Sequence, residues 1–225
     1  QGNTKPIVAI ITGGSPMNLA EVHELADAVL LAWYPGEEGG NAVADIIFGK
    51  TSPSGRLPIT FPKSFEVLPP YEDYSMKGRT YKYMKEEPLY PFGFGLSFTS
   101  FTYSDMKLSS ASIKKDQATE IQVTLTNSGK MEGEEVVQLY ITDDKASTEV
   151  PQFTLNGIKR VKLSPGQSET VKFSITPNML MMVNNLGEKV LEPGTFTISV
   201  GGSLPTQRSA ALGASAVQKI TLTVK

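Results

Sequence analysis

Two adjacent glutamates in a glycine-rich stretch, residues 36–40 (Gly-Glu-Glu-Gly-Gly), are the strongest candidates for chemistry in this chain. The stretch follows an apolar run and precedes an amphipathic segment, so we expect it to join a strand to a helix. Such a loop can bind phosphate at a helix N-terminus. Two carboxylates would repel phosphate and complement the positive end of the helix themselves. We therefore interpret the glycines as close-packing positions and expect no nucleotide or other cofactor.

Glu37 and Glu38 could also act as proton-transfer groups, because open α/β sheets place ligands at the carboxyl ends of their strands. No partner carboxylate at a defined separation is visible in the sequence. We expect the two side chains to line or buttress a cleft.

Other candidate groups each have a simpler structural explanation. His23, the single histidine, has acidic neighbours and is expected to be a solvated surface residue rather than a catalytic one. Residues 13–15 (Gly-Gly-Ser) do not form the Gly-x-Ser-x-Gly nucleophile motif. Asp143 and Asp144 could bind calcium, but a turn between strands explains them, so we expect no metal site.

Arg79 lies among aromatic residues in the stretch 77–83 (Lys-Gly-Arg-Thr-Tyr-Lys-Tyr). This pattern is consistent with a sugar-binding surface and equally with a packing layer between domains. The sequence leaves both interpretations open.

The composition excludes several classes of function. The net charge of −2 gives no basic surface for nucleic acid. The longest apolar runs, such as residues 26–34, are too short to span a membrane and include Asp27. Cysteine is absent, which excludes disulfides, thiolate metal sites and cysteine nucleophiles. We expect no nucleic-acid partner and no membrane span.

The first 62 residues alternate between strand and helix patterns. Apolar runs at 7–12 and 28–33 predict buried parallel strands, and apolar spacing predicts helices at 19–25 and 39–48, with Gly49 as a stop. Two parallel strands cannot cover their own faces. We therefore expect the remaining strands to come from residues upstream of Gln1 or from another chain, and read residues 1–62 as an incomplete doubly wound α/β domain.

Residues 63–225 have a different sequence pattern. Residues 63–97 are a long aromatic-rich connection, which we expect to be an interdomain linker. From residue 98 apolar and polar residues alternate in short runs separated by Pro-Gly and Ser-Gly turns. This period of two predicts an all-β sandwich of the immunoglobulin or fibronectin III type over residues 98–225.

Several motifs in a fixed order resemble the C-terminal region of family 3 glycoside hydrolases. The end of that family's second domain is similar to residues 33–40 (Trp-Tyr-Pro-Gly-Glu-Glu-Gly-Gly), 44–49 (Ala-Asp-Ile-Ile-Phe-Gly) and 53–58 (Pro-Ser-Gly-Arg-Leu-Pro). The passage into its fibronectin III-like domain is similar to residues 78–83 and 88–98, and that domain's strands and turns to residues 127–129, 134–140, 163–166 and 192–196. The resemblance covers nearly the whole chain.

This resemblance implies a retaining β-glycosidase of the β-glucosidase or β-xylosidase kind. In the family, an aspartate nucleophile comes from an N-terminal (β/α)₈ barrel, and the acid/base glutamate of the β-glucosidase branch lies ahead of the strand corresponding to residues 7–12. Neither position has a counterpart here, so no residue of this chain is assigned as catalytic and the chain alone is expected to be inactive. The implied partners are an oligosaccharide substrate and the missing barrel and α/β segment, in cis or as another chain.

The resemblance also suggests roles for particular residues. The strand-end loops of the second domain lie beside the barrel mouth in the family, which implies a cleft wall formed by Gly14, Ser15, Trp33, Tyr34, Glu37 and Glu38. The segment 78–83 corresponds to an interdomain clamp, with Arg79 and Tyr81 as its expected members. The family favours a periplasmic or extracellular location.

Two other functions remain open from the sequence. A non-catalytic carbohydrate-binding or adhesive module would have a similar β-sandwich, but it has no use for an incomplete parallel sheet. A natural scaffold subunit that completes a separately encoded catalytic chain would have the same sequence features, and genomic context would distinguish it.

Overall fold

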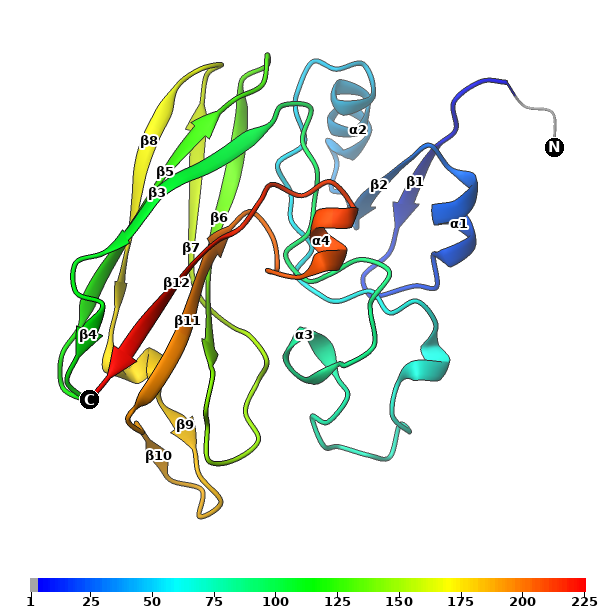
Figure 1. The fold of residues 1–225 in the computed structure, drawn as a ribbon. Coiled ribbons are helices and arrows are strands. Elements are labelled where there is room, and N and C mark those ends of the chain that lie inside the picture. The colour runs from blue at the N-terminus through cyan, green and yellow to red at the C-terminus, as the bar shows by residue number, and fades with distance from the viewer. Residues whose placement is uncertain (1–3) are drawn as a thin grey trace.

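The computed structural model describes residues 4–225, so residues 1–3 at the start of the expected first domain lie outside the described part. An N-terminal α/β part and a C-terminal β-sandwich lie side by side, joined by a connecting segment (Figure 1). The elements in chain order are β1 (Val8–Thr12), α1 (Ala20–Leu25), β2 (Ala28–Trp33), α2 (Gly39–Ile47), α3 (Thr80–Tyr83), β3 (Phe101–Leu108), β4 (Ser112–Ile113), β5 (Thr119–Asn127), β6 (Gly133–Asp143), β7 (Thr154–Leu163), β8 (Ser168–Ile175), β9 (Met182–Val183), β10 (Lys189–Val190), β11 (Gly194–Gly201), α4 (Gln207–Ala211) and β12 (Gln218–Val224). The expected fold class, an α/β fragment followed by a sandwich, is confirmed.

The sandwich consists of two sheets that enclose one hydrophobic core. One sheet has the strand order β4-β12-β11-β6-β7, and the other has the order β3-β5-β8. In β5 the alternation predicted from sequence is realised, since Ile121, Val123 and Leu125 are buried against the opposite sheet. β6 is buried on both faces because the connecting segment covers the face that points away from the core.

The α/β part is a two-stranded parallel sheet formed by β1 and β2. Several apolar side chains of β1 and of the residue before it are uncovered, since Ile7, Val8 and Ile10 are 43%, 47% and 45% exposed. Ile11, Leu31 and Trp33 are partly buried. Two helices flank the strands. α2 ends at Ile47 and is followed by its C-cap Phe48 and by Gly49, whose φ of +69° is the left-handed conformation that favours glycine. The strands have the continuous apolar composition of a covered parallel sheet, but residues 4–225 cover them only in part.

The connecting segment packs against the end of the α/β part. Residues 89–94 run antiparallel to residues 57–61, with hydrogen bonds from Phe61 N to Tyr90 O (3.0 Å) and from Leu57 N to Phe94 O (2.9 Å). Phe61 is fully buried and forms a small second core with Leu19 and Leu89. These contacts attach the segment to the loop that follows β1 and to the stretch that follows α2.

Candidate functional site

The carboxyl ends of β1 and β2 bring the sequence-predicted cleft residues together. Gly13 N donates a hydrogen bond to Trp33 O at 3.1 Å, so the loop after β1 lies directly beside the loop after β2. Gly14 and Ser15 belong to the first loop, and Tyr34, Glu37 and Glu38 belong to the second. The six residues therefore share one edge of the sheet, as parallel strand ends require.

Trp33 has an unusual backbone conformation at this edge. The pairing of β1 and β2 shifts between Ile11 and Thr12, so that Thr12 faces Trp33 and Ala32 is left as an extra residue. Trp33 has a φ of +55°, which is uncommon for a residue with a side chain. Its half-buried indole packs on Phe61, with ring centroids 6.3 Å apart. Bulges and positive φ values re-aim side chains and occur often at functional sites.

Tyr34 is an exposed aromatic side chain that rests on Gly14. It is 80% exposed, and a Cβ added to Gly14 would lie 2.4 Å from Cε2 of its ring. Glycine at position 14 therefore makes room for the tyrosine ring. The arrangement presents a ring to solvent at the strand ends.

Glu37 and Glu38 lie on the surface just before α2. The carboxylate of Glu38 accepts a hydrogen bond from the side-chain amide of Asn41 at 2.5 Å and does not cap the helix backbone. Gly39 is buried, since a Cβ there would lie 2.3 Å from Cβ of Pro35. This glycine serves close packing, as the sequence predicted, and both carboxylates remain open to solvent.

His23 does not lie free on the surface, so the expectation of a solvated histidine was wrong. Its ring is half-buried, and Nδ1 is 2.9 Å from the hydroxyl of Tyr90 in the connecting segment. The two rings also meet edge to face, with centroids 5.4 Å apart. His23 faces this segment because residues 89–94 fold back onto the α/β part, a long-range contact that local sequence does not reveal.

The two expected clamp residues have different surroundings. The guanidinium of Arg79 donates to the backbone oxygens of Pro70 (3.0 Å), Asp73 (2.6 Å) and Ser75 (3.1 Å), all within its own segment. Tyr81, in contrast, stacks on Phe92 with centroids 4.2 Å apart and meets Tyr140 of β6 edge to face. Tyr81 thus contacts the sandwich, whereas these contacts of Arg79 organise a loop.

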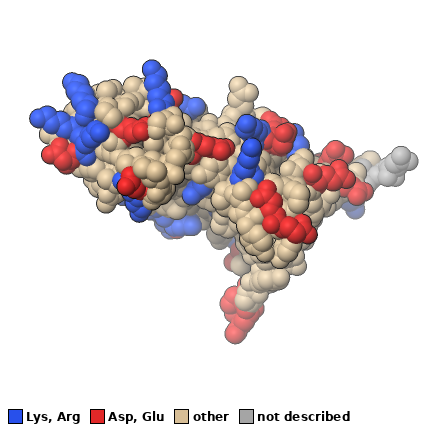
Figure 2. All heavy atoms as spheres, turned by 90° about the horizontal axis from the view of Figure 1, so that it is seen from below, with Lys and Arg blue, Asp and Glu red and all other residues tan. Residues whose placement is uncertain are grey.

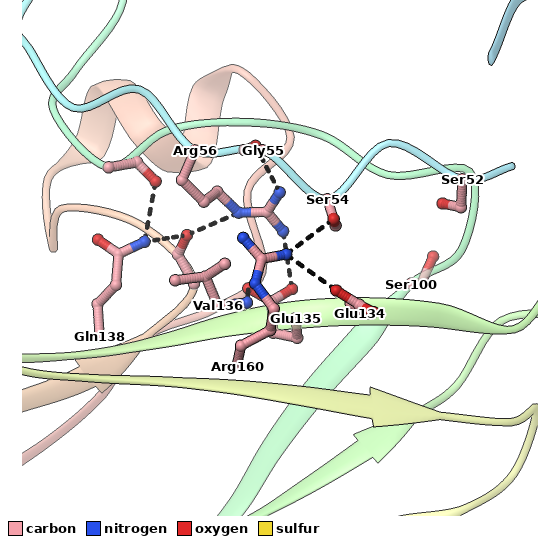
Figure 3. A network of polar contacts seen from close by, with 12 residues as sticks. Ser52, Ser54, Gly55, Arg56, Ser100, Glu134, Glu135, Val136, Gln138 and Arg160 are labelled. Atoms are coloured by element: carbon pink, nitrogen blue, oxygen red, sulfur yellow. Dashed lines mark hydrogen bonds and ion pairs between the residues drawn. The ribbon is translucent and has the colours of Figure 1, made fainter. Parts of the chain in front are cut away.

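A buried ion pair that sequence reasoning missed joins the α/β part to the sandwich (Figure 3). Nη2 of Arg56 donates to Oε2 of Glu135 in β6 at 3.0 Å, and the two side chains are only 7% and 3% exposed. Nε of Arg56 also donates to Gly202 O at 3.3 Å. Arg56 lies in residues 53–58, the stretch of chain that follows α2. Its guanidinium contacts β6 of the sandwich.

The ionisation of this cluster reflects its burial. Desolvation raises the pKa of the Glu135 carboxyl, and Arg56 opposes that rise. The neighbouring Tyr103 is almost fully buried, and its pKa is raised well above the ordinary value, first by burial and then by the charge of Glu135. Burial therefore disfavours the charged form of Glu135, and the charge of Arg56 is what opposes this effect.

Two further contacts extend the junction. The side-chain amide of Gln138 donates to Gly93 O (3.0 Å) and to Gly202 O (2.8 Å), while the Tyr140 hydroxyl donates to Gln138 Oε1 at 2.6 Å. On the outer face, Nη1 of Arg160 in β7 donates to Ser54 Oγ at 2.9 Å and to Glu134 Oε2 at 3.0 Å. Sandwich side chains thus hold both residues 54–56 and the connecting segment.

Comparison with known protein families identifies both parts. Residues 1–98 match the model of the glycosyl hydrolase family 3 C-terminal domain, and residues 135–204 match that of the fibronectin type III-like domain. The chain belongs to glycoside hydrolase family 3. The order of the two domains is the one that the sequence motifs predicted.

Named relatives of this family 3 chain are glycosidases. It is 42% identical over 203 residues to a putative β-xylosidase of Formosa agariphila and 41% identical over 209 residues to a periplasmic β-glucosidase of Salmonella typhimurium, with 88% of the chain covered in each case. Among solved structures, β-glucosidase 3B of Thermotoga neapolitana matches 98% of the chain with a TM-score of 0.85 and 31% identity. The chain spans 27% of the length of the two curated relatives and 31% of the Thermotoga structure.

A signal for the missed ion pair is present in the sequence of the family 3 chain. Glu135 has the same strand parity as Val137, Leu139 and Ile141, which all point into the core. A carboxylate at a core position requires a buried partner. The position of that partner, 79 residues earlier in the chain, comes only from the tertiary fold.

Within residues 4–225 no group of three or more histidine, aspartate or glutamate side chains is arranged to hold a metal ion. No helix in this part of the family 3 chain combines the length and apolarity that crossing a membrane requires.

Gly93→Ala is expected to destabilise the junction. Gly93 has a φ of +72°, and a Cβ there would lie 2.1 Å from Oε1 of Gln138. Both the backbone and the Gln138 network would have to shift, which we expect to lower the free energy of unfolding by about 2–3 kcal/mol. Chemical denaturation of the variant measures this value. Gly194→Ala, where no atom lies within 4 Å of the added Cβ, is the control and is expected to change stability by less than about 1 kcal/mol.

Proposed function

We propose that this chain is the non-catalytic C-terminal part of a retaining β-glycosidase that removes terminal β-linked glucose or xylose from oligosaccharides. The observation that carries the proposal is the incomplete parallel sheet in a chain whose named relatives are β-xylosidases and β-glucosidases. The exposed side chains of Ile7, Val8 and Ile10 support it, because a parallel sheet is stable when both faces are covered.

In this proposal the cover comes from an upstream barrel and α/β segment, supplied in cis or by another chain. Phe48 after α2 and Leu25 at the end of α1 add to the uncovered apolar surface, at 80% and 65% exposed. An apolar surface of this kind is typical of a contact with another protein part. The sandwich then braces the α/β part through Arg56 and Glu135.

The catalytic pair is proposed to lie outside this chain. Retaining glycosidases need two carboxyl groups about 5–5.5 Å apart, one as nucleophile and one as acid/base. Glu37 and Glu38 are adjacent residues on the surface, and both side chains are exposed to solvent. We infer that the isolated chain does not hydrolyse glycosides.

We further propose that the strand-end loops form one wall of the substrate cleft in the complete enzyme. Support comes from the bulge at Trp33 and from the ring of Tyr34, which rests on Gly14 at the same edge. Ser15, Glu37 and Glu38 complete this wall. These residues orient the sugar and do not react with it.

Kinetics of the complete enzyme test the cleft wall. Trp33→Phe and Glu37→Gln are expected to lower kcat/KM by about tenfold, since a misplaced wall weakens substrate positioning. Glu24→Gln, on the exposed side of α1, is the control and should leave kcat/KM unchanged. Unchanged kinetics in both test variants would remove these loops from the substrate site.

A further inference from the structure

The connecting segment presents an exposed aromatic surface that the proposed cleft does not use. Tyr71 and Tyr74 are 86% and 87% exposed, the highest values among the large apolar side chains of the described residues. Phe65, Val67 and Met76, which are 50%, 41% and 48% exposed, lie in the same stretch of chain. Exposed aromatic residues gathered in one short segment are typical of a binding surface.

The backbone that carries the two tyrosines is held in a fixed shape. Asp73 N donates to Pro70 O at 3.0 Å, and Ser75 N donates to Oδ1 of Asp73 at 2.8 Å. The guanidinium of Arg79 gathers the carbonyl oxygens of residues 70, 73 and 75 around itself. Binding by a preorganised loop loses little conformational entropy, so exposed side chains on it are suited to hold a ligand.

The side chains between Tyr71 and Tyr74 indicate which class of ligand the surface could bind. Glu72 and Asp73 are exposed carboxylates, and the hydrogen bond from Ser75 N lowers the pKa of Asp73, which keeps it ionised. Carboxylates accept hydrogen bonds from hydroxyl groups, and a tyrosine ring offers an apolar face with a polar tip.

Lys77 and Arg79 are near enough to act on the charge of Asp73, but the Arg79 guanidinium is occupied by backbone oxygens of the loop. The exposed carboxylates of Glu72 and Asp73 disfavour phosphate, nucleic acid and acidic sugars. On the face of the molecule seen in Figure 2, Asp and Glu side chains are spread over the half nearer the N-terminus, with some Lys and Arg side chains among them.

We propose that residues 70–75 form a saccharide-binding loop for neutral β-linked oligosaccharides. Tyr71 and Tyr74 stack on the C–H faces of sugar rings, and Glu72 and Asp73 accept hydrogen bonds from the sugar hydroxyls. Arg79 is the positioning residue that holds the loop in its binding shape. This function goes beyond hydrolysis, because the loop binds saccharide without taking part in the proposed reaction.

The contrast with Tyr81 supports this assignment. Tyr81 is only two residues from Arg79, but it stacks on Phe92 and contacts the sandwich. The aromatic residues around Arg79 therefore divide into a packing set, represented by Tyr81, and an exposed set, represented by Tyr71 and Tyr74. The exposed set makes no ring contact within the described part of the chain.

The test is affinity electrophoresis of the 225-residue chain through gels containing soluble xylan or β-glucan, followed by titration with xylotetraose and cellotetraose. We expect retardation in at least one gel and a dissociation constant on the order of 1 mM, since few groups engage the ligand. Tyr71→Ala and Tyr74→Ala are each expected to weaken binding about tenfold. Phe48→Ala, which removes another aromatic residue that is 80% exposed, is the matched control and should bind as the parent does.

Arg79→Lys tests whether binding depends on the shape of the loop, which the tyrosine variants do not test. Lysine keeps the charge but cannot reach three carbonyl oxygens with a rigid fork. We expect the Arg79→Lys variant to bind saccharide more weakly than the parent chain, although it keeps both tyrosines, and to have an unchanged circular dichroism spectrum.

Two outcomes would overturn the proposal. One is a result in which the tyrosines do not bind saccharide. The parent chain then binds none of xylan, β-glucan, xylotetraose and cellotetraose, or the Tyr71→Ala/Tyr74→Ala double variant binds them as strongly as the parent does. The other is self-association of the parent chain in sedimentation that the double variant abolishes, which would make the surface a protein contact. Either outcome leaves the proposed glycosidase function intact, since that function is measured by turnover of the complete enzyme.

Discussion

Removing the carboxylate of Glu135 by Glu135→Ala is expected to lower the free energy of unfolding by about 3–5 kcal/mol. This decrease in stability is large because Arg56, which is 7% exposed, would keep its charge without the carboxylate that pairs with it. Arginine does not lose its proton in proteins, so the buried charge cannot be neutralised. Urea denaturation followed by circular dichroism measures the loss.

Arg56→Met is expected to behave differently, because the residue left behind can be neutralised. Without the guanidinium, the pKa of Glu135 rises further than burial already raises it, and the carboxyl takes up a proton. A carboxyl whose pKa is raised in the folded state stabilises the fold below its ordinary pKa and loses that contribution as pH rises through the raised value. The decrease in the free energy of unfolding that Arg56→Met causes should therefore become smaller as pH falls from about 8 to about 5.

Controls separate the buried pair from ordinary surface charge. Lys172 and Glu120 form an ion pair at 2.9 Å with side chains 51% and 48% exposed, so Glu120→Ala is expected to cost less than about 1 kcal/mol. The Arg56→Met/Glu135→Leu double variant should recover much of the stability lost by Glu135→Ala, since no charge is left buried. A double variant as unstable as Glu135→Ala would mean that packing, and not charge, holds this junction.

The second large effect concerns the α/β part of the isolated chain. Amide hydrogens of Ile10 and Leu31 in the paired strands are expected to exchange at least about 1,000-fold faster than those of Val137 and Ile198 in the sandwich core. β1 has exposed apolar side chains and those of β2 are only partly buried, whereas Val137 and Ile198 are fully buried. Local opening of β1 and β2 therefore exposes little new apolar surface and costs little free energy. Hydrogen exchange with residue resolution measures the ratio.

Equally slow exchange in β1 and β2 would contradict this account, provided that sedimentation shows a monomer. The two strands would then be stable without the proposed upstream cover. Fast exchange that slows when the upstream part is supplied would support completion of the sheet by that part.

The sequence predicts the fold class well because hydrophobic period is a local signal. Alternation in β5 and continuous apolar runs in β1 and β2 arise from the faces that each strand buries. The stop at Gly49 is likewise local, since it depends on one left-handed residue. These elements appear in the structure within a few residues of their predicted bounds.

The contacts between elements could not be predicted in the same way. His23 meets Tyr90 across 67 residues of chain, and Arg56 meets Glu135 across 79. The first contact depends on how the connecting segment folds back, and the second on how residues 53–58 lie against β6, and no local pattern encodes either. Arg79 was expected to be part of an interdomain clamp, but its guanidinium binds carbonyl oxygens of its own segment, which became visible only with the backbone in place.

The most direct test of the central claim is hydrolysis of nitrophenyl β-glucoside and nitrophenyl β-xyloside by the purified chain. The account predicts no turnover above the uncatalysed rate by the chain and turnover by the complete enzyme, because it proposes that both catalytic carboxyl groups lie outside the chain. Turnover by the chain alone that is lost in Glu37→Gln or Glu38→Gln would contradict the account and place a catalytic group at the end of β2.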